Sequence, residues 1–195
     1  VFDNSAINQA NGGGGLNISG VSAGGSLTFQ NGASVTVSNL GGSTDGININ
    51  GNGVEFDATF LALSIDASSA GDGIELSGMD NASTFNFNGA TAITGAGNRG
   101  IAITGNTNAG TFTFTDLAIS GATGTGLVVD DGTPVVGITL NGGTGLTNTA
   151  GRSVSVTNID GGSVTFNAGG TINDTGEGIL LQNITTAATV AFNNA

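Results

Sequence analysis

The feature that most constrains this chain is a six-residue pattern, G-I-x-I-x-G, which recurs at a nearly fixed spacing. Its copies begin at Gly15, Gly46, Gly73, Gly100, Gly126, Ser153 and Gly178, and the last three are degenerate. Apolar and polar residues alternate within each copy, which is the periodicity of a β-strand and not of a helix. Repetition at such a fixed step indicates a stacked-repeat architecture.

Two further apolar columns repeat in step with the first. The second contains Phe2, Phe29, Phe60, Phe87, Phe114, Leu140, Phe166 and Phe192, at successive steps of 27, 31, 27, 27, 26, 26 and 26 residues. We assign the long step to a loop around residues 38–43. The third column contains Ile7, Val35, Ile65, Ile93, Ile119, Leu146 and Ile172. Each repeat is therefore predicted to form three short strands joined by corners.

The regular spacing favours a parallel β-helix over an antiparallel sandwich. A sandwich gives no reason for one residue type to return to one column every 26 or 27 residues. A coil that lies directly on the previous coil does give that reason. We predict a single all-β domain over residues 1–195, a right-handed β-solenoid of about seven coils with three strands each. The spacing of parallel strands then predicts a rod roughly 34 Å long.

The composition fits this architecture. The 37 glycines and the many asparagines suit corners with left-handed backbone. Disorder is disfavoured, because 37% of the residues are hydrophobic and only 8% are charged. The chain opens and closes in the phenylalanine column, so we expect either an excerpt of a longer solenoid or a subunit that stacks end to end.

The charge excludes some partners. The net charge is −12, with two arginines and no lysine, so no basic patch can neutralise nucleic acid or an anionic membrane. The chain has no cysteine, and no apolar run is long enough to span a bilayer. Membrane insertion is therefore not expected.

Ordinary enzyme chemistry is not expected either. The carboxylates scatter over several columns, mostly at corners, whereas glycoside hydrolysis needs two that face each other across a groove. The chain has no His, Lys, Trp or Tyr. We therefore predict a non-catalytic protein without a cofactor.

Calcium is the one metal that merits consideration. Asp130, Asp131 and Asp160 lie in Gly-containing turns and offer the oxygen ligands that Ca²⁺ prefers. The interpretation of these residues as turn formers is favoured, so calcium stays a secondary alternative.

One column predicts salt bridges between coils. The residue before the first motif position is successively Asp45, Asp72, Arg99, Thr125, Arg152 and Glu177. Stacking places Arg99 beside Asp72 and Arg152 beside Glu177. As exposed pairs, they are expected to contribute at most about 1 kcal/mol each and to help fix the register.

A polar column offers a competing function. The outward residues of the second strand are Thr28, Thr59, Asn86, Thr113, Thr139, Thr165 and Ala191. A flat threonine array of this kind resembles the ice-binding face of some antifreeze proteins, although Asn86 and Ala191 interrupt it. Threonine is also common on solvated strands. The same ladder could instead be a lateral contact between rods.

The repeated G-I-x-I-x-G, followed by T-F-x-F and T-x-I segments, resembles the strand-repeat regions of giant secreted bacterial surface proteins, such as autotransporter passengers and filamentous adhesins. The resemblance covers the whole chain and transfers no site residues. It implies an extracellular or cell-surface location and a role as filament, stalk or adhesin scaffold. The partner expected is the same solenoid, as a second copy or a longer chain. An adhesin segment that binds a glycan or a host surface is an alternative.

Overall fold

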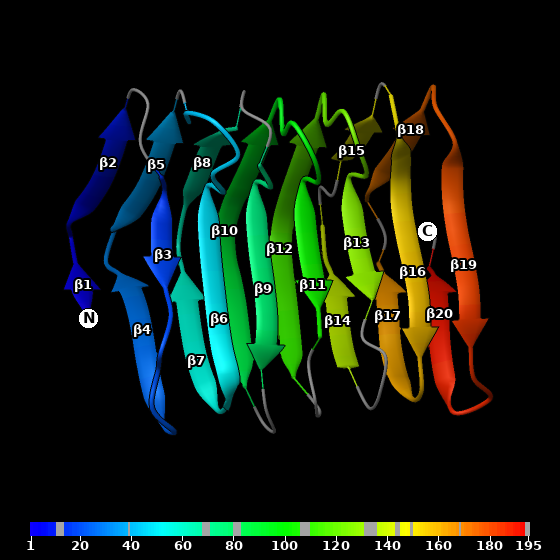
Figure 1. Cartoon of the computed structure of the whole chain (residues 1–195), viewed down its shortest axis with the longest axis horizontal. Coiled ribbons are helices and arrows are strands. Elements are labelled where there is room, and N and C mark those ends of the chain that lie inside the picture. Colours follow the sequence, from blue (N-terminus) through cyan, green and yellow to red (C-terminus); the bar gives the residue numbers. More distant parts are fainter. Residues whose placement is uncertain are drawn as a thin grey trace.

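The computed structural model describes residues 1–10, 14–38, 40–67, 71–79, 83–105, 110–130, 136–142, 145–148, 150–167 and 169–193. All regular elements in these ranges are β-strands, and they form a parallel β-solenoid of about six turns (Figure 1). The predicted all-β solenoid is thus confirmed. None of the described residues forms a helix with the length and hydropathy of a membrane span.

One face of the solenoid is a seven-stranded parallel sheet, in front in Figure 1. Its strands are β3 (Leu16–Ile18), β6 (Ile47–Val54), β9 (Ile74–Met79), β11 (Ile101–Thr104), β13 (Leu127–Asp130), β16 (Arg152–Ile159) and β19 (Gly178–Ile184). The register joins Leu16 to Ile47 and continues through every copy of the first motif to Ile179. The first column therefore lies as the repeat predicts.

The second and third motifs share one larger sheet behind this face. Its main path is β1 (Phe2–Asp3), β4 (Gly25–Gln30), β7 (Phe56–Phe60), β10 (Thr84–Thr94), β12 (Thr111–Ser120), β14 (Val136–Leu140), β17 (Gly162–Phe166) and β20 (Ala188–Phe192). The strands off this path are β2 (Ala6–Ala10), β5 (Ser34–Ser38), β8 (Leu63–Asp66), β15 (Gly145–Asn148) and β18 (Thr171–Asp174).

Three separate strands per coil do not occur throughout. β10 and β12 each run through both the second and the third motif, as strands of 11 and 10 residues. In the β4–β5 connection, Asn31 and Gly32 take positive φ values of 53° and 86° and turn the chain. Asn88 and Gly89 lie inside β10 without such values, so the corner there is reduced to a bulge.

The third column also differs from its predicted alignment at one step. Val35 pairs with Leu63, and Ile65 pairs with Val37. The predicted alignment of Val35 with Ile65 is therefore wrong by two residues. The connection after Phe29 contains the Asn31–Gly32 turn, whereas β8 begins only three residues after Phe60. Because the second connection is shorter, Leu63 and not Ile65 takes the inward position next to Val35.

The core is one continuous apolar cluster inside the coils. Phe29, Phe60, Phe87 and Phe114 stack one above another, with ring centroids 5.3, 5.2 and 4.4 Å apart and planes within 18°. All four rings are essentially inaccessible to solvent. Each ring buries a large apolar area against the next coil, so the phenylalanine column joins the coils energetically.

In the copies that begin at Gly46, Gly73, Gly100 and Gly126, close packing and not a left-handed backbone favours glycine at the first position. A Cβ built on Gly100 would lie 2.5 Å from the carbonyl oxygen of Gly126 and 2.5 Å from Cγ2 of Ile119. By contrast, Gly105 at the end of the same motif has a φ of +61° and open space around it. Left-handed geometry, predicted for the corner glycines in general, thus explains Gly105, and also Gly178 with its φ of +78°, but not the closely packed Gly100.

Candidate functional site

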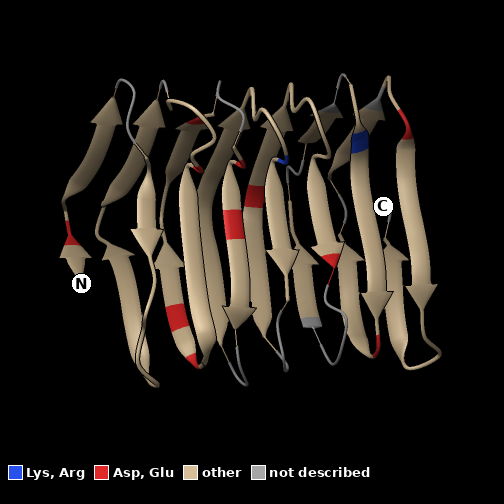
Figure 2. Cartoon of the chain, viewed as in Figure 1, with Lys and Arg blue, Asp and Glu red and all other residues tan. Residues whose placement is uncertain are grey.

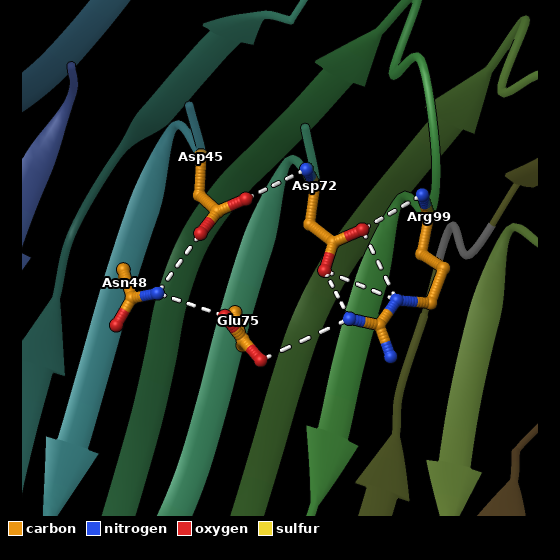
Figure 3. Close-up of polar contacts among 5 residues, drawn as sticks. All are labelled: Asp45, Asn48, Asp72, Glu75 and Arg99. Carbon is orange, nitrogen blue, oxygen red and sulfur yellow. Dashed lines mark hydrogen bonds and ion pairs between the residues drawn. The ribbon is translucent and has the colours of Figure 1, made fainter. Parts of the chain in front are cut away.

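The densest polar cluster described lies where the strands of the seven-stranded sheet begin. It consists of Asp45, Asn48, Asp72, Glu75 and Arg99, which come from three successive coils (Figure 3). Asp45, Asp72 and Arg99 each precede a motif glycine, while Asn48 and Glu75 are paired neighbours in β6 and β9. We call these five residues the acidic cluster.

Two carboxylates of the acidic cluster bridge coils through the backbone. Oδ1 of Asp45 accepts a hydrogen bond of 2.8 Å from the main-chain N–H of Asp72. Oδ1 of Asp72 accepts one of 2.9 Å from the main-chain N–H of Arg99. The main-chain N–H groups of Asp72 and Arg99, which occupy the same position in two successive coils, are thus each hydrogen-bonded to a carboxylate of the coil before. These hydrogen bonds favour the observed register.

Asp72 also holds the guanidinium of Arg99. Nε of Arg99 donates to both carboxylate oxygens at 3.1 and 3.0 Å, and a terminal nitrogen reaches Oδ2 at 2.5 Å. The side chain of Asp72 is only 3% exposed, and that of Arg99 is 27% exposed. Burial disfavours the charged guanidinium, but the hydrogen bond and charge of Asp72 outweigh it and raise the pKa of Arg99.

Asn48 and Glu75 complete the acidic cluster. The amide of Asn48 donates to Oδ2 of Asp45 and to Oε2 of Glu75, both at 2.8 Å. Arg99 approaches the other oxygen of Glu75 at 3.8 Å. Burial raises the pKa of Glu75, and the charges of Asp45 and Asp72 raise it further against the lowering effect of Arg99.

The acidic cluster borders a surface depression of about 230 Å³. Gly14–Asn17 and Ser43–Asp45 line it together with Asn48. Oxygens of Asp45, Asp72 and Glu75 lie within 4.8 Å of one another, which is close enough for a shared divalent cation. Their oxygens already accept hydrogen bonds from Asn48, Arg99 and the backbone, so the geometry observed is that of a cross-coil polar network.

The calcium candidates predicted from the sequence lie elsewhere. Asp130 and Asp160 are exposed, and Asp130 accepts a hydrogen bond of 2.9 Å from the amide of Asn158. Within the described ranges, neither belongs to a group of three or more metal-ligating side chains. Asp131 lies outside the described residues.

The two arginines lie beside the acids that stacking assigned to them, but the two pairs differ in burial. Arg152 contacts Glu177 at 2.7 Å, with side chains 32% and 62% exposed. Asp72 is buried within the acidic cluster. The expectation of two exposed pairs is therefore wrong for Asp72 and Arg99, because the Asp72 side chain is only 3% exposed and the Arg99 guanidinium contacts both of its carboxylate oxygens.

The threonine ladder forms a continuous outward column on the larger sheet. The register joins Thr28, Thr59, Asn86, Thr113, Thr139, Thr165 and Ala191 in that order. Each of these residues is half-buried, as expected for side chains that stand side by side on a flat strand face.

Sequence reasoning did not identify Asp45, Asn48 and Glu75 as members of the same site as Asp72. The signal was present, since Asp45 and Asp72 occupy equivalent positions and Asn48 and Glu75 are equivalent three residues later. Asp45 and Asp72 precede their strands, so the alternation of side chains along a strand does not predict that they share a face with Asn48 and Glu75.

No protein-family model, curated protein or solved structure matches this chain.

Proposed function

We propose that this chain is a non-catalytic structural rod, which forms a filament, stalk or adhesin scaffold. The observation that carries the proposal is the continuity of the apolar columns. Parallel register runs from β1 to β20 on one sheet and from β3 to β19 on the other, over a single core. Such a construction transmits a fixed axial spacing from coil to coil and builds length.

The finer features of the proposal follow from the repeat and its resemblance. We infer a right-handed winding of seven coils of 26 or 27 residues within one domain, about 34 Å in length at the usual strand spacing. The location is extracellular or on a bacterial surface, no cofactor is needed, and the partner is the same solenoid.

Assembly of the 195-residue polypeptide tests this function directly. Light scattering over a concentration series, followed by electron microscopy, should show rods of constant width that lengthen as concentration rises. A polypeptide that stays a short monomer at every concentration would refute self-assembly. Turnover of polysaccharide substrates by the purified chain would refute the non-catalytic role.

Ice binding is a second candidate, favoured by the continuous register of the outward column on the larger sheet, although Asn86 and Ala191 interrupt its threonines. Thr113 lies near the middle of that column, so Thr113→Arg should abolish any thermal hysteresis. Thr104→Arg on the seven-stranded sheet is the matched control and should leave it unchanged. Absence of thermal hysteresis in the unaltered chain would eliminate this candidate.

A further inference from the structure

Side-chain contacts connect successive turns of the rod from β4 to β12. We call ring stacks, ion pairs and hydrogen bonds between side chains of adjacent turns side-chain bridges. The phenylalanine column described above is one row of such bridges and extends to Phe114. A second aromatic row joins Phe56, Phe85 and Phe112, with ring centroids 6.3 and 5.3 Å apart. The acidic cluster adds a third row, which ends at Arg99.

Other side-chain bridges connect the turns from β13 to β20. Two rows of amide hydrogen bonds run along this part, with donor–acceptor distances of 2.7 to 3.1 Å. One row joins Asn141, Asn167 and Asn193, and the other joins Asp130, Asn158 and Asn183. The two parts of the rod are thus bridged by different chemistry, with aromatic rings and carboxylates in the first and mainly amides in the second.

Both sets of bridges stop at the same place. After Phe114 the phenylalanine column continues as Leu140, and the second aromatic row continues as Ile138. After Arg99 the charged column continues as Thr125. Among the described residues, no ring stack, ion pair or hydrogen bond between two side chains joins positions 99–129 to the positions one turn later.

We call this contact the seam. It lies between β11 and β12 on one side and β13, β14 and β15 on the other. Backbone pairing continues across it, Ile138 and Leu140 are fully buried, and the hydroxyl of Thr147 donates to the carbonyl oxygen of Ile119 at 3.4 Å. The stretch without side-chain bridges, residues 99–129, is longer than one step of 26 residues. The seam therefore crosses the whole section of the rod.

A contact without side-chain bridges is weaker than its neighbours. In a stack of repeats, stability is approximately the sum of the stability of each repeat and of the contacts between neighbouring repeats. Aromatic pairs and charge-assisted hydrogen bonds add to the stabilisation that buried area and backbone pairing supply at every turn. Opening of the rod therefore requires the least free energy where these additions are missing.

We infer that the seam divides the rod into two cooperative units, residues 1–120 and 121–193, and that it is the first contact between turns to open as the protein unfolds. A rod with such a seam can lose one unit while the other keeps its fold. The inference concerns a single chain and does not depend on self-assembly, so the two can fail separately.

Position 125 gives the sharpest test of the seam. Thr125 is half-buried and lies in the charged column between Arg99 and Arg152. Figure 2 shows these two arginines in blue, on either side of β13. In the two turns before, the carboxylates of Asp45 and Asp72 each accept the main-chain N–H of the next residue in this column. Thr125→Asp would place a carboxylate beside both arginines and make the column continuous.

Hydrogen exchange measured by mass spectrometry in rising denaturant reports the opening of each segment of the intact chain. In the unaltered chain, peptides on one side of the seam should lose protection together, while those on the other side stay protected to a higher denaturant concentration. Gly137 and Asn141 donate backbone hydrogen bonds across the seam to Gly110 and Phe114. Peptides that contain these two donors should therefore exchange with the less stable unit.

Thr125→Asp should raise the midpoint of the lower transition and narrow the gap between the two transitions. Thr125→Lys is the matched control, since it puts a third positive charge between the arginines and should lower that midpoint. High salt should reduce both shifts, because the side chains are partly exposed. A single transition for all peptides, a boundary elsewhere in the chain, or shifts of the same sign for the two variants would overturn the inference.

Discussion

Asp72 and Glu177 offer a direct comparison of a buried and an exposed ion pair within one column. Each carboxylate binds an arginine one coil away, but the Asp72 side chain is 3% exposed and that of Glu177 is 62% exposed. Asp72→Ala removes the acceptor for both the main-chain N–H and the guanidinium of Arg99. Glu177→Ala removes the acceptor of a pair that water already surrounds.

The expected magnitudes differ clearly. Loss of one partner of a fully buried pair costs about 3–5 kcal/mol. Arg99 keeps 27% exposure and can be partly rehydrated, so we expect Asp72→Ala to lower the free energy of unfolding by about 2–4 kcal/mol. Glu177→Ala should cost less than about 1 kcal/mol. For a chain of this size the larger loss corresponds to a Tm lower by roughly 5–15 °C.

Denaturant unfolding at low and high salt measures both effects. Salt should diminish the effect of Glu177→Ala, since exposed charges are screened, and should leave most of that of Asp72→Ala. Asp72→Asn retains an acceptor for the Arg99 backbone and removes one of three neighbouring negative charges, so its loss should be intermediate. Equal losses for Asp72→Ala and Glu177→Ala would refute the reasoning from burial.

Three further predictions concern the packing and the charges of the coils. Gly100→Asn should destabilise the chain by more than about 2 kcal/mol in a thermal unfolding assay, because the Cβ of the new side chain would clash with the next coil. Gly105→Asn should be nearly neutral in the same assay, because asparagine tolerates a left-handed backbone. Phe87→Ala should cost about 3–5 kcal/mol of unfolding free energy. Phe192→Ala should cost much less, because Phe192 is half-exposed. Similar losses for the two variants would contradict the view that each coil is stabilised mainly by contacts with its neighbouring coils. Glu75→Gln should stabilise the chain at neutral pH, because the raised pKa of Glu75 means that the fold disfavours the charged carboxylate. In unfolding curves measured from pH 7 downward, this gain in stability should vanish below pH 4.5, the ordinary pKa of a glutamate, where the carboxyl is protonated in both the folded and the unfolded chain. A gain that persists at low pH would show that it does not come from ionisation.

Most strands and most of their register could be predicted from the columns alone, but the step from Val35 to Leu63 and the corners could not. Asn31-Gly32 and Asn88-Gly89 are the same dipeptide at comparable points of two coils. The first adopts positive φ angles and turns, while the second lies within β10. The choice depends on how the neighbouring coils hold the chain, and a local sequence contains no record of that environment.

The candidate site was partly predictable for a related reason. Stacking one column gave the contacts of Arg99 with Asp72 and of Arg152 with Glu177. A second outward column adds contacts that this one column does not contain, since Asn48 donates to Asp45 and Glu75 lies 3.8 Å from Arg99. Burial is a property of several columns at once, so single-column reasoning treated two unequal pairs as equal.

The stacking of coils also explains why substitution of the same residue type should change stability by different amounts along the rod. Phe87 contacts a ring above and a ring below, whereas Phe192 contacts one ring and is 43% exposed. The stability of a coil thus comes largely from its neighbours, so a substitution in one column costs most where the residue contacts equivalent residues of the coils on both sides.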